Sequence, residues 1–333
     1  MIEHSIDPAR SVRPPHHRFP AWHAGVGVLC AIFAISALVA CGGPKALTVQ
    51  SQGLFPEGLE YDDGRDAFLI TSLTQGQVHA VREGQTPELI VDDQDLVSAI
   101  GLRIDRERDL LFVCSSDPGV SAKTAPATQK QLAGLGVYDL NSGEKKKFIR
   151  LDALNDGAQF CNDIALGPKG ALYVTNSFSP VVYKVDADLK ASVLAEEPAL
   201  AANGFGLNGI VMAGKQLLVA HSVAGSLHTV DPASGAMARV DLSDSIEHAD
   251  GLVLLAPNRV AVAQNAINQV AVFESTDNWK TAKRVRVYDQ GFSFPTTGVF
   301  ANGKLFYLNG KLHELFGGNR NVPEFEIREL PLN

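Results

Sequence analysis

The sequence predicts an all-β fold: a six-bladed β-propeller with four-stranded antiparallel blades and a metal site on its central axis. The first observation is a repeated pattern, in which a polar residue opens an apolar strand and a tight turn leads to a second apolar strand that ends in polar residues. The second is its spacing of roughly 40–50 residues in four of the five intervals, which is typical of propeller blades. The third is composition, because 30 Gly and 17 Pro with 20% charged residues indicate a folded, turn-rich chain.

Six copies of the pattern predict six blades. Their first residues are Glu57, Ile100, Asn162, Asn208, Asp250 and Thr297. The longest interval contains a loop at residues 115–134 that carries Lys123 and Lys130. Long loops on the open face of a domain are often functional, so this loop is expected to be either a lid or a tolerated surface insertion.

The strands follow in order within each repeat. A short strand at Ala46–Gln50 is expected to pair with the last segment, Phe325–Leu330, because ring closure removes the open sheet edges. The four strands of the first blade are predicted at Gly58–Tyr61, Ala67–Thr71, Gln77–Val81 and Glu88–Val91.

The N-terminal region differs from the repeats. Arginines precede the uncharged run Ala24–Ala40, as in an export signal, and Leu38–Cys41 resembles a bacterial lipobox, whose cysteine is acylated. The expected organisation is a lipoprotein signal peptide at 1–40, a lipidated tether at 41–46 and the propeller at 47–333. The alternative is an uncleaved anchor helix, although the apolar run is at the short edge for a membrane span.

Lipid on Cys41 would anchor the chain to a membrane. Gly42, where inner-membrane lipoproteins carry Asp, predicts the outer membrane, with the propeller on its periplasmic or extracellular face. The mature chain would keep Cys114 and Cys161 in a compartment that permits a disulfide. Because they lie at different kinds of strand position, two buried free thiols are at least equally expected.

Charge and motifs exclude several functions. A formal charge of −8 provides no basic field, so no nucleic-acid partner is expected. The sequence has no phosphate-binding Gly-rich loop, no Gly-x-Ser-x-Gly nucleophile elbow and no zinc-type Cys/His spacing. The expected partner is a small molecule, and the expected state is a monomer.

The first residues of the six inner strands should form a ring around the axis. Glu57, Asn162, Asn208 and Asp250 bring oxygen donors to this ring, and their carboxylates would repel each other without a cation between them. Donors that are all oxygen favour a hard ion, Ca²⁺ first and Mg²⁺ or Mn²⁺ next. The alternative is an axis filled by small side chains and water.

A family resemblance rests on four pairs of residues, Glu57-Gly58, Asn162-Asp163, Asn208-Gly209 and Asp250-Gly251. They resemble the metal constellation of the senescence-marker-protein/gluconolactonase/luciferin-regenerating-enzyme family. The resemblance implies a six-bladed propeller that binds Ca²⁺ or another divalent ion and hydrolyses lactones. It also implies that Glu57, Asn208 and Asp250 ligate the metal, that Asn162 contacts metal or substrate, and that Asp250 is the general base.

The sequence departs from related patterns at Ile100, where paraoxonases place a catalytic His. Sugar-binding groups are also lacking near the second blade unless Arg103 or the loop lysines supply them, so an apolar lactone or ester is favoured. His221, at the end of the second strand of the fourth blade, is a candidate proton relay or else a rim histidine. His248 is a weaker candidate for the same role.

Other side chains are candidates for supporting roles. Asn176 and Asn265 should orient the ligands, and Phe205, Phe292 and Phe294 should either wall an apolar pocket or pack in the core. Two functions follow: a metal-dependent lactone or ester hydrolase, or a non-catalytic propeller that binds a ligand or partner around a structural metal.

Overall fold

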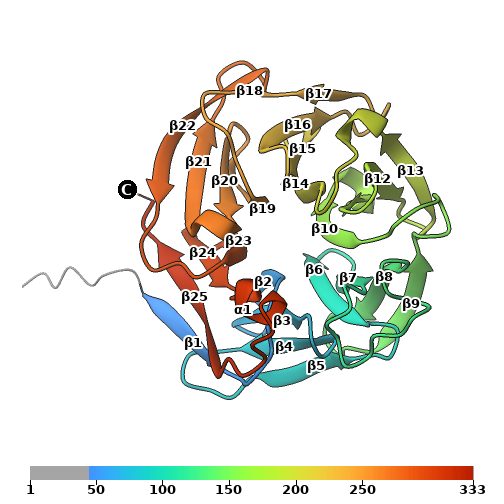
Figure 1. Cartoon of the computed structure of the whole chain (residues 1–333), viewed down its shortest axis with the longest axis vertical. Coiled ribbons are helices and arrows are strands. Elements are labelled where there is room, and N and C mark those ends of the chain that lie inside the picture. The colour runs from blue at the N-terminus through green and yellow to red at the C-terminus, as the bar shows by residue number, and fades with distance from the viewer. Residues whose placement is uncertain (1–44, 333) are drawn as a thin grey trace, which may run out of the picture. The chain divides into compact units, whose positions relative to one another are not determined.

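Six sheets arranged in a ring form the fold (Figure 1). The computed structural model describes residues 45–332. Blade 1 consists of β2 (Leu59–Asp62), β3 (Ala67–Ser72), β4 (Gln77–Val81) and β5 (Glu88–Asp92). Blade 2 consists of β6 (Ser98–Asp105), β7 (Leu110–Ser116), β8 (Ala133–Asp139) and β9 (Lys145–Arg150). Blade 3 consists of β10 (Cys161–Leu166), β11 (Leu172–Asn176), β12 (Val181–Val185) and β13 (Ala191–Glu196).

The second half repeats this plan. Blade 4 consists of β14 (Leu207–Ala213), β15 (Gln216–His221), β16 (Ser226–Val230) and β17 (Met237–Arg239). Blade 5 consists of β19 (Ala249–Ala256), β20 (Arg259–Gln264), β21 (Gln269–Glu274) and β22 (Thr281–Tyr288), and β18 (Asp241–Leu242) joins β22 in parallel as a fifth strand. Blade 6 consists of β23 (Pro295–Ala301), β24 (Lys304–Asn309), β25 (Glu324–Leu330) and β1 (Ala46–Gln50). The α-helix α1 (Leu312–Phe316) precedes β25, and short 3-10 helices lie at Pro168–Gly170, Pro198–Leu200 and Asn265–Ile267.

The ring closes through its innermost and outermost strands. The inner strands β2, β6, β10, β14, β19 and β23 contact one another in that order, and β23 contacts β2. At the periphery β1 pairs antiparallel with β25, with Val49 opposite Phe325. The predicted six-bladed propeller and its closing strand are therefore confirmed.

Burial explains the sequence of each strand. The second strand of blade 4, β15, has apolar residues in succession because its faces pack on two neighbouring sheets, and its residues after Gln216 are all buried. The outermost strand of blade 2, β9, begins with three exposed lysines and buries Ile149. Apolar cores fill the spaces between blades, so no single blade is stable alone.

The predicted signal peptide and Cys41 lie outside the described residues. Within residues 45–332, no helix has the length and hydropathy needed to cross a bilayer.

Candidate functional site

Five of the six inner strands carry a one-residue bulge at the same place. In blade 4, Leu207 pairs with His221 and Ile210 pairs with Val219, so the inner strand contains one extra residue between these pairs. Blades 2, 3, 5 and 6 show the same register shift. A bulge turns its side chains away from the normal alternation, and here it contains the predicted ring residues.

The glycine after several ring residues allows the inner strands to approach one another. A Cβ atom on Gly101 would lie 2.4 Å from the carbonyl oxygen of Asn162, and one on Gly209 would lie 2.4 Å from that of Asp250. Each X-Gly pair thus places a ring residue on the axis and leaves room for the next blade. Blade 3 has Asp163 instead, whose carboxylate accepts hydrogen bonds from the backbone N–H groups of Ile164 and Ile210.

The four predicted ligands line one cavity of about 260 Å³ at the mouth of the ring. Glu57, Asn162, Asn208 and Asp250 form its polar part. Ile100, from the equivalent slot of blade 2, lines it too, whereas Thr297 lines a small cavity deeper on the axis. The sequence therefore identified which residues meet. In residues 45–332 no group of three His, Cys, Asp or Glu side chains is placed to hold a metal ion, and two of the four predicted ligands are amides.

Hydrogen bonds leave oxygen atoms of this cluster available. Asn162 donates through Nδ2 to Ser177 Oγ at 2.8 Å, and Asn265 donates through Nδ2 to Asp250 Oδ2 at 2.9 Å. Glu57 Oε2 and Asn208 Oδ1 are buried and have no hydrogen-bond partner within the described part of the chain. Unpaired buried acceptors are costly, and a hard cation would satisfy them.

The electrostatics of the cluster also favour a bound cation. Burial raises the pKa of Glu57 well above its usual range, and the nearby carboxylates of Asp250 and Asp163 raise it further. Burial also raises the pKa of Asp250 to about 7, although hydrogen bonds from Asn265 and Asn208 oppose the shift. A positive charge between Glu57 and Asp250 would stabilise their ionised forms.

An ion-pair layer lies beneath the ring. Arg103 pairs with Glu60 at 2.5 Å, approaches Asp163 at 3.9 Å and donates to the carbonyl oxygen of Ile164 at 2.9 Å. Between this layer and the ring is a cavity of about 10 Å³, room for about one water molecule. Arg103 lines this cavity and the opposite mouth of the ring but not the cavity of about 260 Å³, so it is not placed to bind a sugar lactone there.

His221 does not reach the cavity, because the backbone occupies both of its ring nitrogens. Nδ1 accepts from the N–H of Ala224 at 3.1 Å, and Nε2 lies 2.9 Å from the carbonyl oxygen of Leu200. This geometry matches the alternative of a rim histidine and does not support a proton relay. His248 does line the cavity, as does Asn265.

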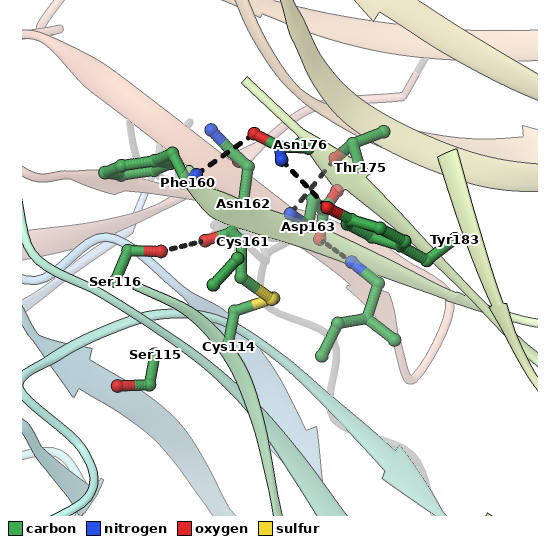
Figure 2. The surroundings of a disulfide bond; sticks show 12 residues. Cys114, Ser115, Ser116, Phe160, Cys161, Asn162, Asp163, Thr175, Asn176 and Tyr183 are labelled. Carbon is green, nitrogen blue, oxygen red and sulfur yellow. Dashed lines mark hydrogen bonds between the residues drawn. A yellow bond between two sulfur atoms is a disulfide. The ribbon is translucent and has the colours of Figure 1, made fainter. Parts of the chain in front are cut away.

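Asn176 has a different role from the one expected. Its Oδ1 accepts from the backbone N–H of Phe160 at 3.0 Å, and its Nδ2 donates to Tyr183 at 3.0 Å (Figure 2). The same Nδ2 also donates to Gln159 Oε1. It therefore fixes the segment that leads into β10 and contacts no ring residue directly. Of the two asparagines, Asn265 is the one that hydrogen-bonds a predicted ligand, Asp250.

A disulfide bond joins Cys114 on β7 to Cys161 on β10, with a Cα–Cα distance of 5.3 Å. Of the two alternatives that the sequence left open, a disulfide or two buried free thiols, the structure shows the disulfide. The two residues belong to sheets that face each other across the blade 2–blade 3 interface, where both are fully buried. Cys161 immediately precedes Asn162, and Figure 2 shows the bridge below Asn162, so the bond ties one ring residue to the neighbouring blade.

The long loop of blade 2 is a strap rather than a lid. Lys123 Nζ donates to the carbonyl oxygens of Gly76 at 3.1 Å and Asp93 at 2.8 Å, which lie on blade 1 and on the segment that follows it. Asp117 accepts from the hydroxyls of Thr124 and Thr128 inside the loop. None of these residues lines the cavity.

The cover of the cavity instead comes from blade 6. Helix α1, close to the axis in Figure 1, is anchored by buried Leu315 and places Leu312 and Phe316 in the cavity wall. Of the two roles that the sequence left open, Phe205 and Phe294 line the cavity, whereas Phe292 packs against a core cluster of blades 5 and 6. Five helical residues are too few to show a helical period, so α1 could not be recognised from the sequence.

Comparison with known proteins identifies the family. A family model described as SMP-30/Gluconolactonase/LRE-like region matches residues 55–306. The chain belongs to the SMP-30/gluconolactonase/LRE-like family. This family includes gluconolactonases, so membership supports a propeller hydrolase of the lactonase type. No curated protein matches the chain.

Solved structures share the fold of this SMP-30/gluconolactonase/LRE-like protein at low identity. The major allergen Mala s 1 of Malassezia sympodialis has a TM-score of 0.69 at 16% identity, over 87% of this chain and 97% of that one. A luciferin-regenerating enzyme has a TM-score of 0.61 at 12% identity, over 87% and 96%. A gluconolactonase from Xanthomonas campestris has a TM-score of 0.60 at 15% identity, over 87% and 91%. At these identities the likeness is one of fold.

Proposed function

We propose that this protein hydrolyses a lactone or an ester at the polar end of the cavity, with a divalent cation held by Glu57, Asn162, Asn208 and Asp250. The observation that carries the proposal is the pair of buried, unpartnered oxygens, Glu57 Oε2 and Asn208 Oδ1, beside a second buried carboxylate. An all-oxygen donor set fits Ca²⁺ best, with Mg²⁺ or Mn²⁺ as alternatives. When bound, such an ion supplies a Lewis acid for the carbonyl oxygen and lowers the pKa of water.

Side chains of the protein act as the general base and orient the groups of the site. Asp250 takes the proton of the attacking water, as a general base, through the oxygen that Asn265 does not hold. Asn265 fixes the orientation of that carboxylate, and Ser177 fixes the amide of Asn162. The ion-pair layer around Arg103 closes the site from below.

Asp250→Asn tests the assignment of the base and the cation site together. We expect turnover of a simple lactone such as γ-butyrolactone to fall by about 10²-fold or more, and calorimetry with Ca²⁺, Mg²⁺ and Mn²⁺ to show weaker binding. Asp63→Asn, in an exposed turn between β2 and β3, is the matched control. Undiminished turnover in Asp250→Asn, or in wild type with chelator, would contradict the proposal.

A second candidate function is a non-catalytic binding propeller with a structural cation. It is favoured by the position of His221, whose ring nitrogens are both bonded to backbone, and by apolar Ile100 in the cavity. Cation-dependent melting without turnover of any lactone or ester would support this alternative.

A further inference from the structure

We infer that the ligand of this cavity carries an alkyl chain or a single aromatic ring beside its carbonyl, and that Phe205 and Phe316 determine this preference. The inference rests on the proposed function and specifies its substrate class. It starts from the two kinds of side chain that line the cavity: the oxygen cluster, and an apolar wall that includes Phe160, Phe205 and Phe316.

Three packed aromatic rings make the wall rigid. Phe160, Phe178 and Phe205 have ring centroids 5.0–5.2 Å apart in edge and tilted arrangements, which are favourable geometries for aromatic contact. Phe160 is only 3% exposed, and Asn176 holds its backbone N–H. The part of the wall formed by Phe160 and Phe205 is thus in place before any ligand binds, which lowers the entropic cost of binding.

The rim of the cavity is apolar and open to solvent. Val223 and Phe316 line the cavity and are 61% and 50% exposed. Ile267, next to cavity-lining Ala266, is 45% exposed. Burial of such side chains against an apolar ligand group is favourable, and a cluster of them at a pocket marks a binding surface.

Polar substituents would find few partners in the same space. Beyond the oxygen cluster, the polar side chains of the lining are Ser222, His248 and Asn265, and Asn265 already donates to Asp250. A polyhydroxylated sugar lactone would leave hydroxyl groups against aromatic rings without hydrogen bonds, which costs binding energy. The volume of about 260 Å³ lies just below the usual range for drug-sized ligands, so one chain or one ring fits.

The test is a series of γ-lactones with lengthening alkyl chains, together with glucono-δ-lactone, assayed in Ca²⁺. We expect kcat/KM to rise by about threefold to fourfold per added methylene until the cavity is filled. Glucono-δ-lactone should be the poorest substrate. Lactams of matching chain length, which resist hydrolysis, measure the same trend as affinity by calorimetry.

Two alanine variants test whether Phe316 and Phe205 determine the preference for apolar substituents. Phe316→Ala and Phe205→Ala should flatten the dependence on chain length in both assays. Phe300→Ala is the matched control: Phe300 is 41% exposed at the opposite mouth of the ring, and its removal should leave the slope intact. Phe316 is exposed, so its variant tests the wall even if Phe205→Ala fails to fold.

The outcomes separate the two proposals. Turnover with no rise along the series, or with sugar lactones preferred, overturns the apolar preference and leaves the hydrolase intact. A rising affinity for lactams without turnover of any lactone or ester overturns the hydrolase and keeps the apolar ligand. Neither turnover nor lactam binding overturns both.

Discussion

Two carboxylates buried side by side dominate the chemistry at the scale of single residues. Glu57 and Asp250 face one cavity, and burial favours the protonated form of each. In the folded chain without a cation they hold protons that the unfolded chain would release. The stability of this protein should therefore depend on pH and on cations together.

Stability without a cation should fall as pH rises. The pKa of Asp250 is raised from its ordinary 3.8 to about 7, and that of Glu57 shifts the same way. Between about pH 4 and pH 7 the folded state then binds more protons than the unfolded state, so the free energy of unfolding decreases with pH. In chelator, Tm should be several degrees higher near pH 5 than near pH 8.

Calcium should reverse that loss. Added Ca²⁺ should raise Tm strongly near pH 8 and weakly near pH 5, where protons compete for the same oxygens. Asp250→Asn should flatten the pH dependence, since it removes one titrating group. Thermal melts between pH 5 and pH 8, in chelator and in Ca²⁺, test both predictions. A Tm that rises with pH in chelator would contradict the predicted loss of stability.

At the scale of elements, the bulged inner strands explain why the ring could be predicted from sequence. The same slot of each repeat meets the axis because the same bulge recurs in blades 2 to 6, and Asn208 and Asp250 occupy that slot. Contacts between blades could not be predicted in this way. Cys114 and Cys161 differ in strand type yet face each other across an interface.

The depth of Arg103 along the axis could not be predicted from the repeat pattern. It lies three residues beyond Ile100, and at about 3.3 Å per residue this displacement carries its side chain to the opposite mouth. The repeat pattern identifies a blade but not the depth of each side chain along the axis. The strap of blade 2 and helix α1 have no counterpart in the other repeats, so their positions depended on tertiary contacts that the sequence does not reveal.

Removal of the disulfide should loosen blade 3 at its inner strand. Cys114→Ala with Cys161→Ala is expected to lower the free energy of unfolding by about 2–5 kcal/mol. Cation affinity should fall as well, because Cys161 precedes Asn162. Denaturant unfolding and calorimetry measure the two effects, and Cys114→Ala alone should match the double variant in stability. A double variant as stable as wild type would show that the bond is dispensable.

At the scale of the whole molecule, the ring depends on strand β1. It supplies the outermost strand of blade 6 from the other end of the chain, and Val49 packs in the same core cluster as Phe325. The repeat pattern predicted this closure, since a ring of sheets leaves no unpaired inner edge.

A chain that begins at Ser51 should be strongly destabilised. Without β1, the edge of β25 is exposed along its length, and exposed strand edges pair with other chains. We expect a lower Tm and aggregation on size-exclusion chromatography. Val49→Ala is the milder comparison and should lower Tm without aggregation. A monomeric truncated chain with wild-type Tm would refute the importance of closure.

The N-terminal leader bears on where the whole molecule is located. We propose that Cys41 is acylated and that the lipid holds the propeller at the outer membrane. Cys41→Ser should abolish incorporation of labelled palmitate and retain the leader on the chain, whereas Cys30→Ser, within the predicted signal peptide, should do neither. Palmitate on the Cys41→Ser chain would contradict the proposal.

The layer formed by Arg103, Glu60 and Asp163 seals the central shaft of the propeller. Within residues 45–332, the cavity that holds the oxygen cluster meets solvent beside Phe316 and Val223, which line it and are 50% and 61% exposed. Under the proposed hydrolysis, the hydroxy acid product would leave past the same two side chains by which the next substrate arrives. If the proposed cation is bound, the carboxylate of the product would be attracted to it, so turnover should slow as product accumulates.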